Sequence, residues 1–196
     1  MTTGLSLPPL AGGLLVGGAS RRFGRPKALE PLAGRTFAER IAEALAALTG
    51  EVVLLGGGEI PAALGGLPRC ADAQGVRGPL AGVLAGLAAR PDRAWLIAAC
   101  DQPWLDGAAL AWLVACRAPG RIAVLPRTTA ERVEPFPGVY EPAARAVLER
   151  AARDGELSLQ PFGRRPDVVT PRLPPALAAA WRDVDAPTDL EPPGAG

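Results

Sequence analysis

The chain has 196 residues, of which 48% are hydrophobic, so it is long enough and apolar enough to bury a substantial core. Its 21 basic and 20 acidic residues nearly cancel, which gives no electrostatic support to a global role on nucleic acid or on a membrane surface. The sequence contains no histidine, which excludes Ser–His and Cys–His catalysis and any histidine metal site.

The three cysteines, Cys70, Cys100 and Cys116, are odd in number and lack the spacing of metal ligands. This pattern is typical of reduced thiols in a cytoplasmic protein. The first ten residues lack the basic flank and long apolar run of a signal peptide, and no uninterrupted apolar stretch approaches eighteen residues, so we expect no membrane span.

Apolar runs alternate with helical patterns along the first half of the chain. The run at residues 10–18 ends in glycines and predicts a short buried strand. Thr36 and Glu39 have the spacing of a capping box at the start of a helix over 36–48. The remaining predicted elements of this half are strands at 51–58 and 93–100 and a helix at 78–90.

The second half is less regular. A helix opened by Asp106 is predicted over 106–117, followed by a strand at 121–126. Beyond residue 126 we expect a strand at 134–140, a helix at 141–153, a strand end and turn within 178–190, and a frayed tail at 191–196. Strands that alternate with helices predict an α/β protein, with a mostly parallel sheet between two helical layers. The Pro/Gly stretches between elements are short, so residues 1–196 are predicted to form one domain.

The loop at 13–29 combines four glycines, four cations and no acid. Glycines allow the backbone to approach an anion closely, and the cations Arg21, Arg22, Arg25 and Lys27 suit a polyphosphate. Lys27 is the only lysine, although the chain has twenty arginines, which indicates that a compact point charge is required there. Chance survival of this lysine in an arginine-rich composition is the alternative. The spacing fits neither the Walker pattern nor the dinucleotide fingerprint. On chemistry alone, a solvated basic loop remains the alternative.

Two further loops, each of which follows a predicted strand, contain polar residues. Asp101 comes directly after the apolar strand at 93–100, where it could hold a divalent metal that bridges phosphates. The alternative role, a cap for the next helix, suits Asp106 better. In the loop 72–82, Asp72 and the small residues Gly75 and Gly78 could line a flat base, but a plain helix-entry loop is equally compatible with them.

The stretch LVGGASRRFGRPK at 15–27 resembles the signature of the nucleotidyltransferases that act on molybdenum cofactor. GPLAG at 78–82, CDQP at 100–103, PFPGVY at 135–140 and DVDAPTDL at 183–190 follow in that family's order, so the resemblance covers about residues 10–190. It implies a Rossmann-like three-layer fold that binds a nucleotide at the strand ends.

The resemblance also implies roles for individual residues. Leu15, Val16 and Gly17 would line the base and ribose pocket. Asp72 and Gly78 would contact the nucleotide, and Asp101 would hold Mg²⁺. The triphosphate would be held by Gly18, Ser20, Arg22, Gly24 and Lys27, of which Arg22 and Lys27, together with Asp101, would act in catalysis.

The sequence departs from the family pattern at two places. Phe23 replaces the usual methionine, and DVDAP at 183–187 stands where guanylyl-transferring members often have Asn-Val-Asn-Thr-Pro. The chain contains no asparagine at all, so the second change can be compositional drift. It can also supply a second metal ligand, Asp185.

The implied reaction transfers GMP from GTP to the terminal phosphate of molybdopterin and releases pyrophosphate. Gly17-Gly18 and Gly78-Pro79-Leu80 favour GTP, whereas the acidic DVD weakly favours CTP. A cytidylyltransferase, a non-catalytic cofactor carrier and a sugar-nucleotide enzyme are the alternatives; the presence of Lys27 and Asp101 argues against the carrier, and the short chain against the last. Docking to molybdoenzymes or their chaperones, the oligomeric state and the pterin contacts are left open.

Overall fold

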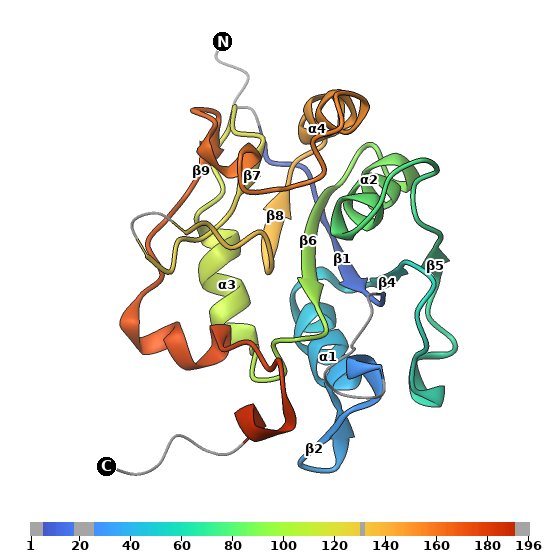
Figure 1. Ribbon diagram of the computed structural model, residues 1–196. Coiled ribbons are helices and arrows are strands. Elements are labelled where there is room, and N and C mark those ends of the chain that lie inside the picture. Colours follow the sequence, from blue (N-terminus) through green and yellow to red (C-terminus); the bar gives the residue numbers. More distant parts are fainter. Residues whose placement is uncertain (1–5, 18–25, 130–131, 191–196) are drawn as a thin grey trace.

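The computed structural model describes residues 6–17, 26–129 and 132–190, and these residues form a mixed sheet between two layers of helices (Figure 1). In the described part of the chain the main sheet has seven strands. In spatial order they are β5 (Arg69–Cys70), β4 (Val52–Leu55), β1 (Leu10–Leu15), β6 (Ala94–Ala99), β8 (Gly138–Tyr140), β7 (Ala123–Val124) and β9 (Val168–Val169). The predicted α/β class is therefore confirmed.

The two halves of the sheet differ in direction. From β5 to β6 every neighbouring pair is parallel, whereas β8 pairs antiparallel with both β6 and β7. The last pair, β7 with β9, is again parallel. The predicted strands at 10–18, 51–58, 93–100, 121–126 and 134–140 all exist, but the fourth is reduced to two paired residues.

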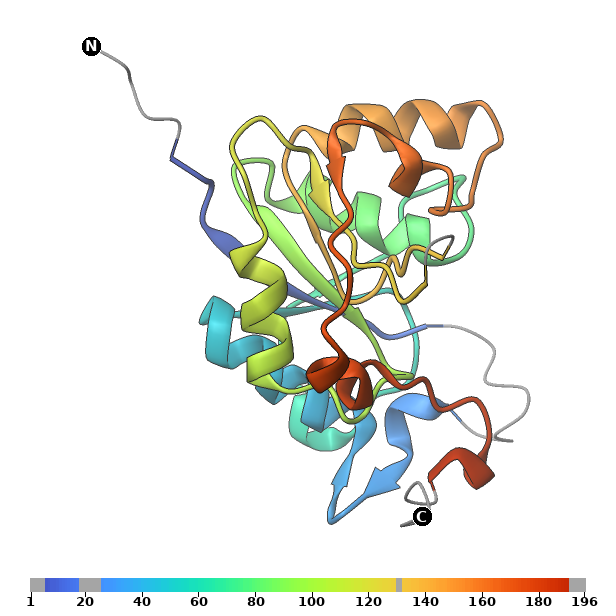
Figure 2. The ribbon, with the colours of Figure 1, turned by 90° about the vertical axis from the view of Figure 1, so that its left-hand side faces the viewer.

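Helices cover both faces of the sheet, and each face carries its own core (Figures 1 and 2). On one face, α1 (Phe37–Thr49) and α3 (Gly107–Ala115) bury Ile41, Leu45 and Leu110 against the strands. On the other, α2 (Pro79–Ala89) and α4 (Ala144–Arg153) bury Leu84 and Leu148. The central strand β6 serves both cores because its alternate side chains point to opposite faces. Leu96 belongs to the first core, Trp95 and Ile97 to the second.

Two of these helices begin where the sequence predicts, at residues whose side chains cap the helix. Thr36 Oγ1 accepts a hydrogen bond from the amide of Glu39, whose carboxylate accepts one from the amide of Thr36, which completes the predicted capping box. The Asp106 carboxylate accepts a 2.8 Å hydrogen bond from the amide of Ala109 at the start of α3.

The prediction of a strand end within 178–190 is wrong. The chain instead forms two 3-10 helices, η4 (Pro175–Trp181) and η5 (Pro187–Leu190). Proline fixes φ near the helical value and suits the first turn of a helix, and both segments begin with one. The tail at 191–196 lies outside the described residues, and the single-domain organisation stays a prediction.

Several short elements have no clear sequence signal. They are the hairpin of β2 (Pro31–Leu32) and β3 (Arg35–Thr36), the edge strands β5 and β9, and the 3-10 turns η1 (Lys27–Leu29), η2 (Ala62–Leu64) and η3 (Phe162–Arg164). Cys70, Cys100 and Cys116 are all free thiols. In the described ranges, no helix is both long enough and apolar enough to cross a membrane.

Candidate active site

A cavity of about 500 Å³ opens at the carboxyl ends of β1, β4 and β6. Ligands of open parallel sheets bind at this edge, beyond the ends of the strands. Most predicted site residues that the structure describes line this cavity, although they come from separate stretches of sequence: Leu15, Val16, Gly17, Lys27, Asp72, Gly78 and Asp101. Gly18, Ser20, Arg22 and Gly24, which were predicted to hold the triphosphate, lie outside the described residues, as do Arg21, Phe23 and Arg25.

The site residues follow one another across the cavity in the spatial order of the strands that precede them. Asp101 follows β6, Val16 and Gly17 follow β1, Gly56 follows β4, and Asp72 follows β5. The cavity thus extends across four neighbouring parallel strands. Lys27 reaches it from the turn η1, which precedes α1.

Asp101 is half-buried at the end of β6, in surroundings that make its negative charge costly. Burial raises the pKa of its carboxyl group, and the nearby carboxylates of Asp183 and Asp185 raise that pKa further, while the Lys27 ammonium lowers it. A carboxylate held in this way gains stability from any additional cation. Its surroundings therefore favour the binding of a positive charge beside it.

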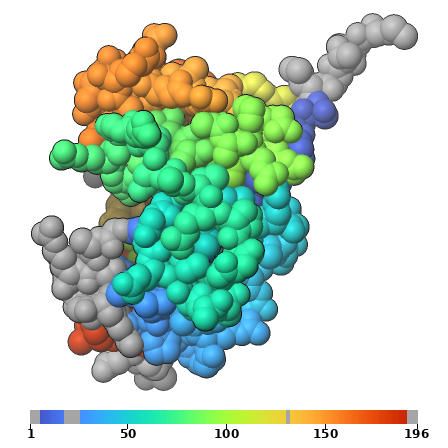
Figure 3. Space-filling view, turned by 90° about the vertical axis from the view of Figure 1, so that its right-hand side faces the viewer, coloured from blue at the N-terminus to red at the C-terminus, as the bar shows by residue number. Residues whose placement is uncertain are grey.

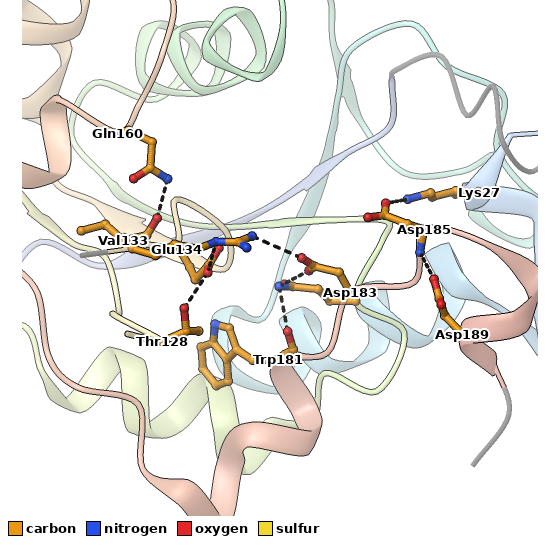
Figure 4. A network of polar contacts seen from close by, with 11 residues as sticks. Lys27, Thr128, Val133, Glu134, Gln160, Trp181, Asp183, Asp185 and Asp189 are labelled. Carbon is orange, nitrogen blue, oxygen red and sulfur yellow. Dashed lines mark hydrogen bonds and ion pairs between the residues drawn. The ribbon is translucent and has the colours of Figure 1, made fainter. Parts of the chain in front are cut away.

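Lys27 and Asp185, which are 158 residues apart in the sequence, form an ion pair at this site (Figure 4). Lys27 Nζ donates a 2.8 Å hydrogen bond to Asp185 Oδ1; the side chain of Lys27 is 17% exposed and that of Asp185 62%. Asp185 does not line the cavity itself, but its partner Lys27 does. The predicted second carboxylate therefore lies next to the cation that was predicted to hold phosphate.

The segment that carries Asp185 is attached to the Asp101 loop by several hydrogen bonds. The amide of Val184 donates to the carbonyl of Asp101 at 2.7 Å. Gln102, which is 3% exposed, donates through Nε2 to Asp183 Oδ1 at 3.0 Å. The carboxylate of Asp189 accepts from the amide of Asp185 at 2.8 Å and so closes the turn. Gln102 has a positioning contact that the sequence interpretation missed, although it lies within the quoted CDQP motif.

The residues at this site suit a magnesium ion. Magnesium is bound in nucleotide enzymes by one or two carboxylates, completed by substrate phosphates and water. Asp101 and Asp185 offer such oxygens, and the half-buried carboxylate of Asp101 lies near two further carboxylates, those of Asp183 and Asp185. Over the described ranges the structure has no group of three or more His, Cys, Asp or Glu residues that could hold a metal ion. Any ion here would therefore need ligands from a bound substrate.

The glycine-rich loop that follows β4 closes the far end of the cavity. The amide of Gly58 donates a 2.6 Å hydrogen bond to the carbonyl of Val16, and the amide of Gly56 donates to the carbonyl of Cys70 at 2.9 Å. A Cβ at residue 58 would lie 2.3 Å from the Val16 oxygen, so the contact requires glycine. This loop and the adjacent Glu59 line the cavity but were not among the predicted site residues. Its run of three glycines after a strand was the available signal.

Comparison with known proteins places this geometry in a family. Residues 12–167 match the MobA-like NTP transferase domain. The chain belongs to the MobA-like NTP transferase family. A probable molybdenum cofactor guanylyltransferase of Opitutus terrae is 38% identical over 158 residues, which are 78% of this chain and 77% of that relative. Another from Rhodopirellula baltica is 32% identical over 95% of this chain and 92% of its own length.

Solved structures confirm the fold of this family member. The crystal structure of molybdopterin-guanine dinucleotide biosynthesis protein A from Archaeoglobus fulgidus superimposes with a TM-score of 0.73, over 92% of this chain and 94% of the other. The two sequences are 23% identical, so the likeness establishes the fold alone.

Proposed function

We propose that the protein is a molybdenum cofactor guanylyltransferase, which transfers GMP from GTP to the terminal phosphate of molybdopterin. The observation that carries this proposal is the cavity at the strand ends, which collects seven of the residues that the family resemblance assigns to the nucleotide. The identity with the probable guanylyltransferases over most of the chain supports the same conclusion. A cytoplasmic location, expected from the three free cysteines, is part of the proposal.

In the proposed reaction an oxygen of the molybdopterin phosphate bonds to the α-phosphorus of GTP. The bond from that phosphorus to the oxygen bridging to the β-phosphate breaks, and pyrophosphate leaves. The attacking phosphate is ionised near pH 7, so the chain needs no general base, which agrees with its lack of histidine. Positioning and charge stabilisation are then the work of the protein.

The cations and carboxylates divide this work. Lys27 lines the cavity and would neutralise the triphosphate and the departing pyrophosphate. The family resemblance assigns the same task to Arg22. Asp101 and Asp185 would hold magnesium, which when bound neutralises phosphate charge and polarises the α-phosphate. The Lys27 ammonium has three N–H donors, so it can contact the triphosphate while it keeps its hydrogen bond to Asp185. Each charge-assisted contact contributes about 1.5–3 kcal/mol.

The acceptor would approach from the side of β8 and η4, opposite to the β4 and β5 ends. Arg132, Glu134 and Asp183 form a polar cluster there, in which Arg132 contacts Glu134 at 2.8 Å and Asp183 at 3.7 Å (Figure 4). Phe136 lines the cavity on the same side. These residues could contact the molybdopterin, which must present its phosphate to the α-phosphorus.

Competition between nucleotides tests the proposal. Purified protein with magnesium and molybdopterin is given equal GTP and CTP, and the dinucleotide products are separated and quantified. We expect the guanine product to exceed the cytosine product by at least about a hundredfold, because a wrong base leaves buried polar groups unpaired. Dominance of the cytosine product would overturn the guanylyl assignment, and the absence of any dinucleotide would favour a non-catalytic carrier.

The variant Gly17→Ala tests the role of Gly17 in the same competition assay. A Cβ at residue 17 would have no neighbour within 4 Å among the described atoms, so the substitution leaves the protein's own packing intact. Gly17 lines the cavity, and the added methyl group would take up space needed by the nucleotide. We expect the preference for GTP over CTP to fall, mainly through weaker use of GTP.

A further inference from the structure

The cavity has two chemically different ends. Lys27 and Asp101 lie at the β6 side, and the loop 56–59 and Asp72 lie beyond β4 and β5 (Figure 3 shows this β5 side of the molecule). Neighbouring strands are about 4.8 Å apart, so the β4 end lies about 10 Å from the β6 end. A nucleotide whose phosphates contact Lys27 and Asp101 would therefore place its base over the ends of β4 and β5.

The backbone at the end of β1 is largely occupied. The amide of Val16 donates to the carbonyl of Leu55 at 2.9 Å, and the carbonyl of Val16 accepts the 2.6 Å bond from Gly58. The carbonyl of Leu15 accepts a hydrogen bond from the Cys100 thiol at 3.1 Å. These two residues therefore supply a wall for the base, and the groups that distinguish one base from another must come from elsewhere.

Gly58 fixes the position from which a side chain suited to this task starts. Its backbone is held against Val16 by the 2.6 Å hydrogen bond, and the contact leaves no room for a Cβ. The next residue, Glu59, is therefore attached to a fixed point at the β4 end, and it lines the cavity. Across residues 6–17, 26–129 and 132–190, no hydrogen bond or ion pair engages the exposed carboxylate of Glu59.

We infer that Glu59 recognises the guanine base, with its two carboxylate oxygens accepting hydrogen bonds from guanine N1–H and N2–H₂. This inference rests on the proposed function and names the residue that selects its nucleotide. An ionised carboxylate only accepts hydrogen bonds, and it can accept two parallel ones. Guanine presents two adjacent donors on its Watson–Crick edge, which matches this pattern.

The same carboxylate disfavours the other bases. Adenine and cytosine each place a ring-nitrogen acceptor beside their single amino donor, and uracil places carbonyl acceptors on both sides of its one N–H. Each of these acceptors would face a carboxylate oxygen, and the repulsion would add to the lost hydrogen bond. Glu59 can therefore both attract guanine and reject its competitors.

Inosine triphosphate provides an atom-level test because its base keeps N1–H and lacks the N2 amino group. The dissociation constants of GTP and inosine triphosphate are measured by titration calorimetry with magnesium, for the wild type and for Glu59→Ala. A hydrogen bond to a charged group contributes about 1.5–3 kcal/mol, so the wild type should prefer GTP by roughly tenfold to a hundredfold. In Glu59→Ala the two nucleotides should bind within about twofold of each other.

Two further variants test whether the change in the ratio of dissociation constants is specific to Glu59. Glu156→Ala removes an exposed glutamate remote from the cavity and should keep the wild-type ratio. Asp72→Asn alters the other carboxylate at this end of the cavity and should weaken both nucleotides without changing their ratio. If the preference for GTP over inosine triphosphate is lost in Asp72→Asn and kept in Glu59→Ala, then Asp72 recognises guanine and the inference is overturned.

The inference and the proposed function can fail separately. If the wild type forms the guanine dinucleotide from GTP but Glu59→Ala keeps the ratio of dissociation constants, Glu59 does not recognise guanine and the proposed function stands. If the wild type forms no guanine dinucleotide, the proposed function fails whatever the ratio. Unchanged thermal unfolding of Glu59→Ala would show that a changed ratio comes from the lost contact, as expected for an exposed side chain.

Discussion

The parallel and antiparallel halves of the sheet have different tasks. On the parallel side, β5, β4, β1 and β6 are followed by glycines, Asp72 and Asp101, and these ends form the cavity of the candidate site. On the other side, β8, β7 and β9 are only two or three residues long, and their surroundings are held by side-chain contacts. The comparison teaches that the candidate binding residues gather at the ends of the parallel strands, whereas the other half of the sheet is joined to the rest of the molecule by buried contacts.

Arg117 and Glu141 are the clearest example of the second kind. Arg117 Nε donates to Glu141 Oε1 at 2.6 Å and Nη2 donates to Glu141 Oε2 at 3.0 Å and to the carbonyl of Pro8 at 2.8 Å. Both side chains are less than a tenth exposed. The pair therefore joins the turn after α3, the residue after β8, and the segment before β1.

The largest effect we expect is the loss of stability on breaking this pair. Glu141→Ala leaves the buried guanidinium of Arg117 without its partner, which should lower the free energy of unfolding by about 3–5 kcal/mol. The matched control is Glu149→Ala, which breaks the half-exposed pair between Arg145 and Glu149 and should cost less than about 1 kcal/mol. Urea unfolding measures both. Similar losses for the two variants would mean that burial of the first pair is energetically unimportant.

The second effect concerns the parallel half, where we expect activity to fall without loss of stability. Asp101→Asn keeps the shape of the side chain and removes the charge that magnesium needs. The turnover of GTP should fall at least about a hundredfold, equivalent to about 2.7 kcal/mol of transition-state stabilisation. Removing a half-buried carboxylate whose pKa is raised by burial and by Asp183 should leave the thermal midpoint unchanged or higher. A strongly destabilised variant, or one with unchanged magnesium dependence, would contradict the metal assignment.

The sequence predicted the parallel half better because its signals are local. Apolar runs, glycine stops and the Thr36 capping box each depend on neighbouring residues, and they located β1, β4, β6 and α1 within a few positions, although not the edge strand β5. Lys27, Asp72 and Asp101 could be assigned to one site because parallel strands bring their carboxyl ends to one edge. The family motifs supplied their chemical roles.

The rest depended on tertiary contacts that no local pattern encodes. The 3-10 helices at 175–190 are held by bonds from Val184 to Asp101 and from Gln102 to Asp183, which are some eighty residues apart in the sequence. The ion pair of Lys27 and Asp185 spans 158 residues. Gly58 appears in the sequence as one of three glycines, and only its hydrogen bond to Val16 shows which of them the cavity requires.

The smallest effect we argue is the replacement of the only lysine. Lys27→Arg keeps the positive charge but exchanges a compact ammonium for a planar guanidinium, in a position where the side chain is only 17% exposed. Turnover of GTP should fall at least about tenfold, which is about 1.4 kcal/mol of transition-state stabilisation. Arg35→Lys is the control, because Arg35 forms an exposed pair with Glu43 outside the cavity, and its kinetics should match the wild type.

A substitution of Asp185 tests whether Lys27 acts on the phosphates directly or through its ion pair with Asp185. If the loss in Lys27→Arg comes from a distorted pair with Asp185, then Asp185→Asn alone should reduce turnover as strongly, and the double variant should lose no more than either single variant. We expect instead that Asp185→Asn loses less than tenfold and that the losses accumulate, because Lys27 acts on the phosphates directly. Wild-type turnover of Lys27→Arg would mean that the position has no chemical requirement for lysine.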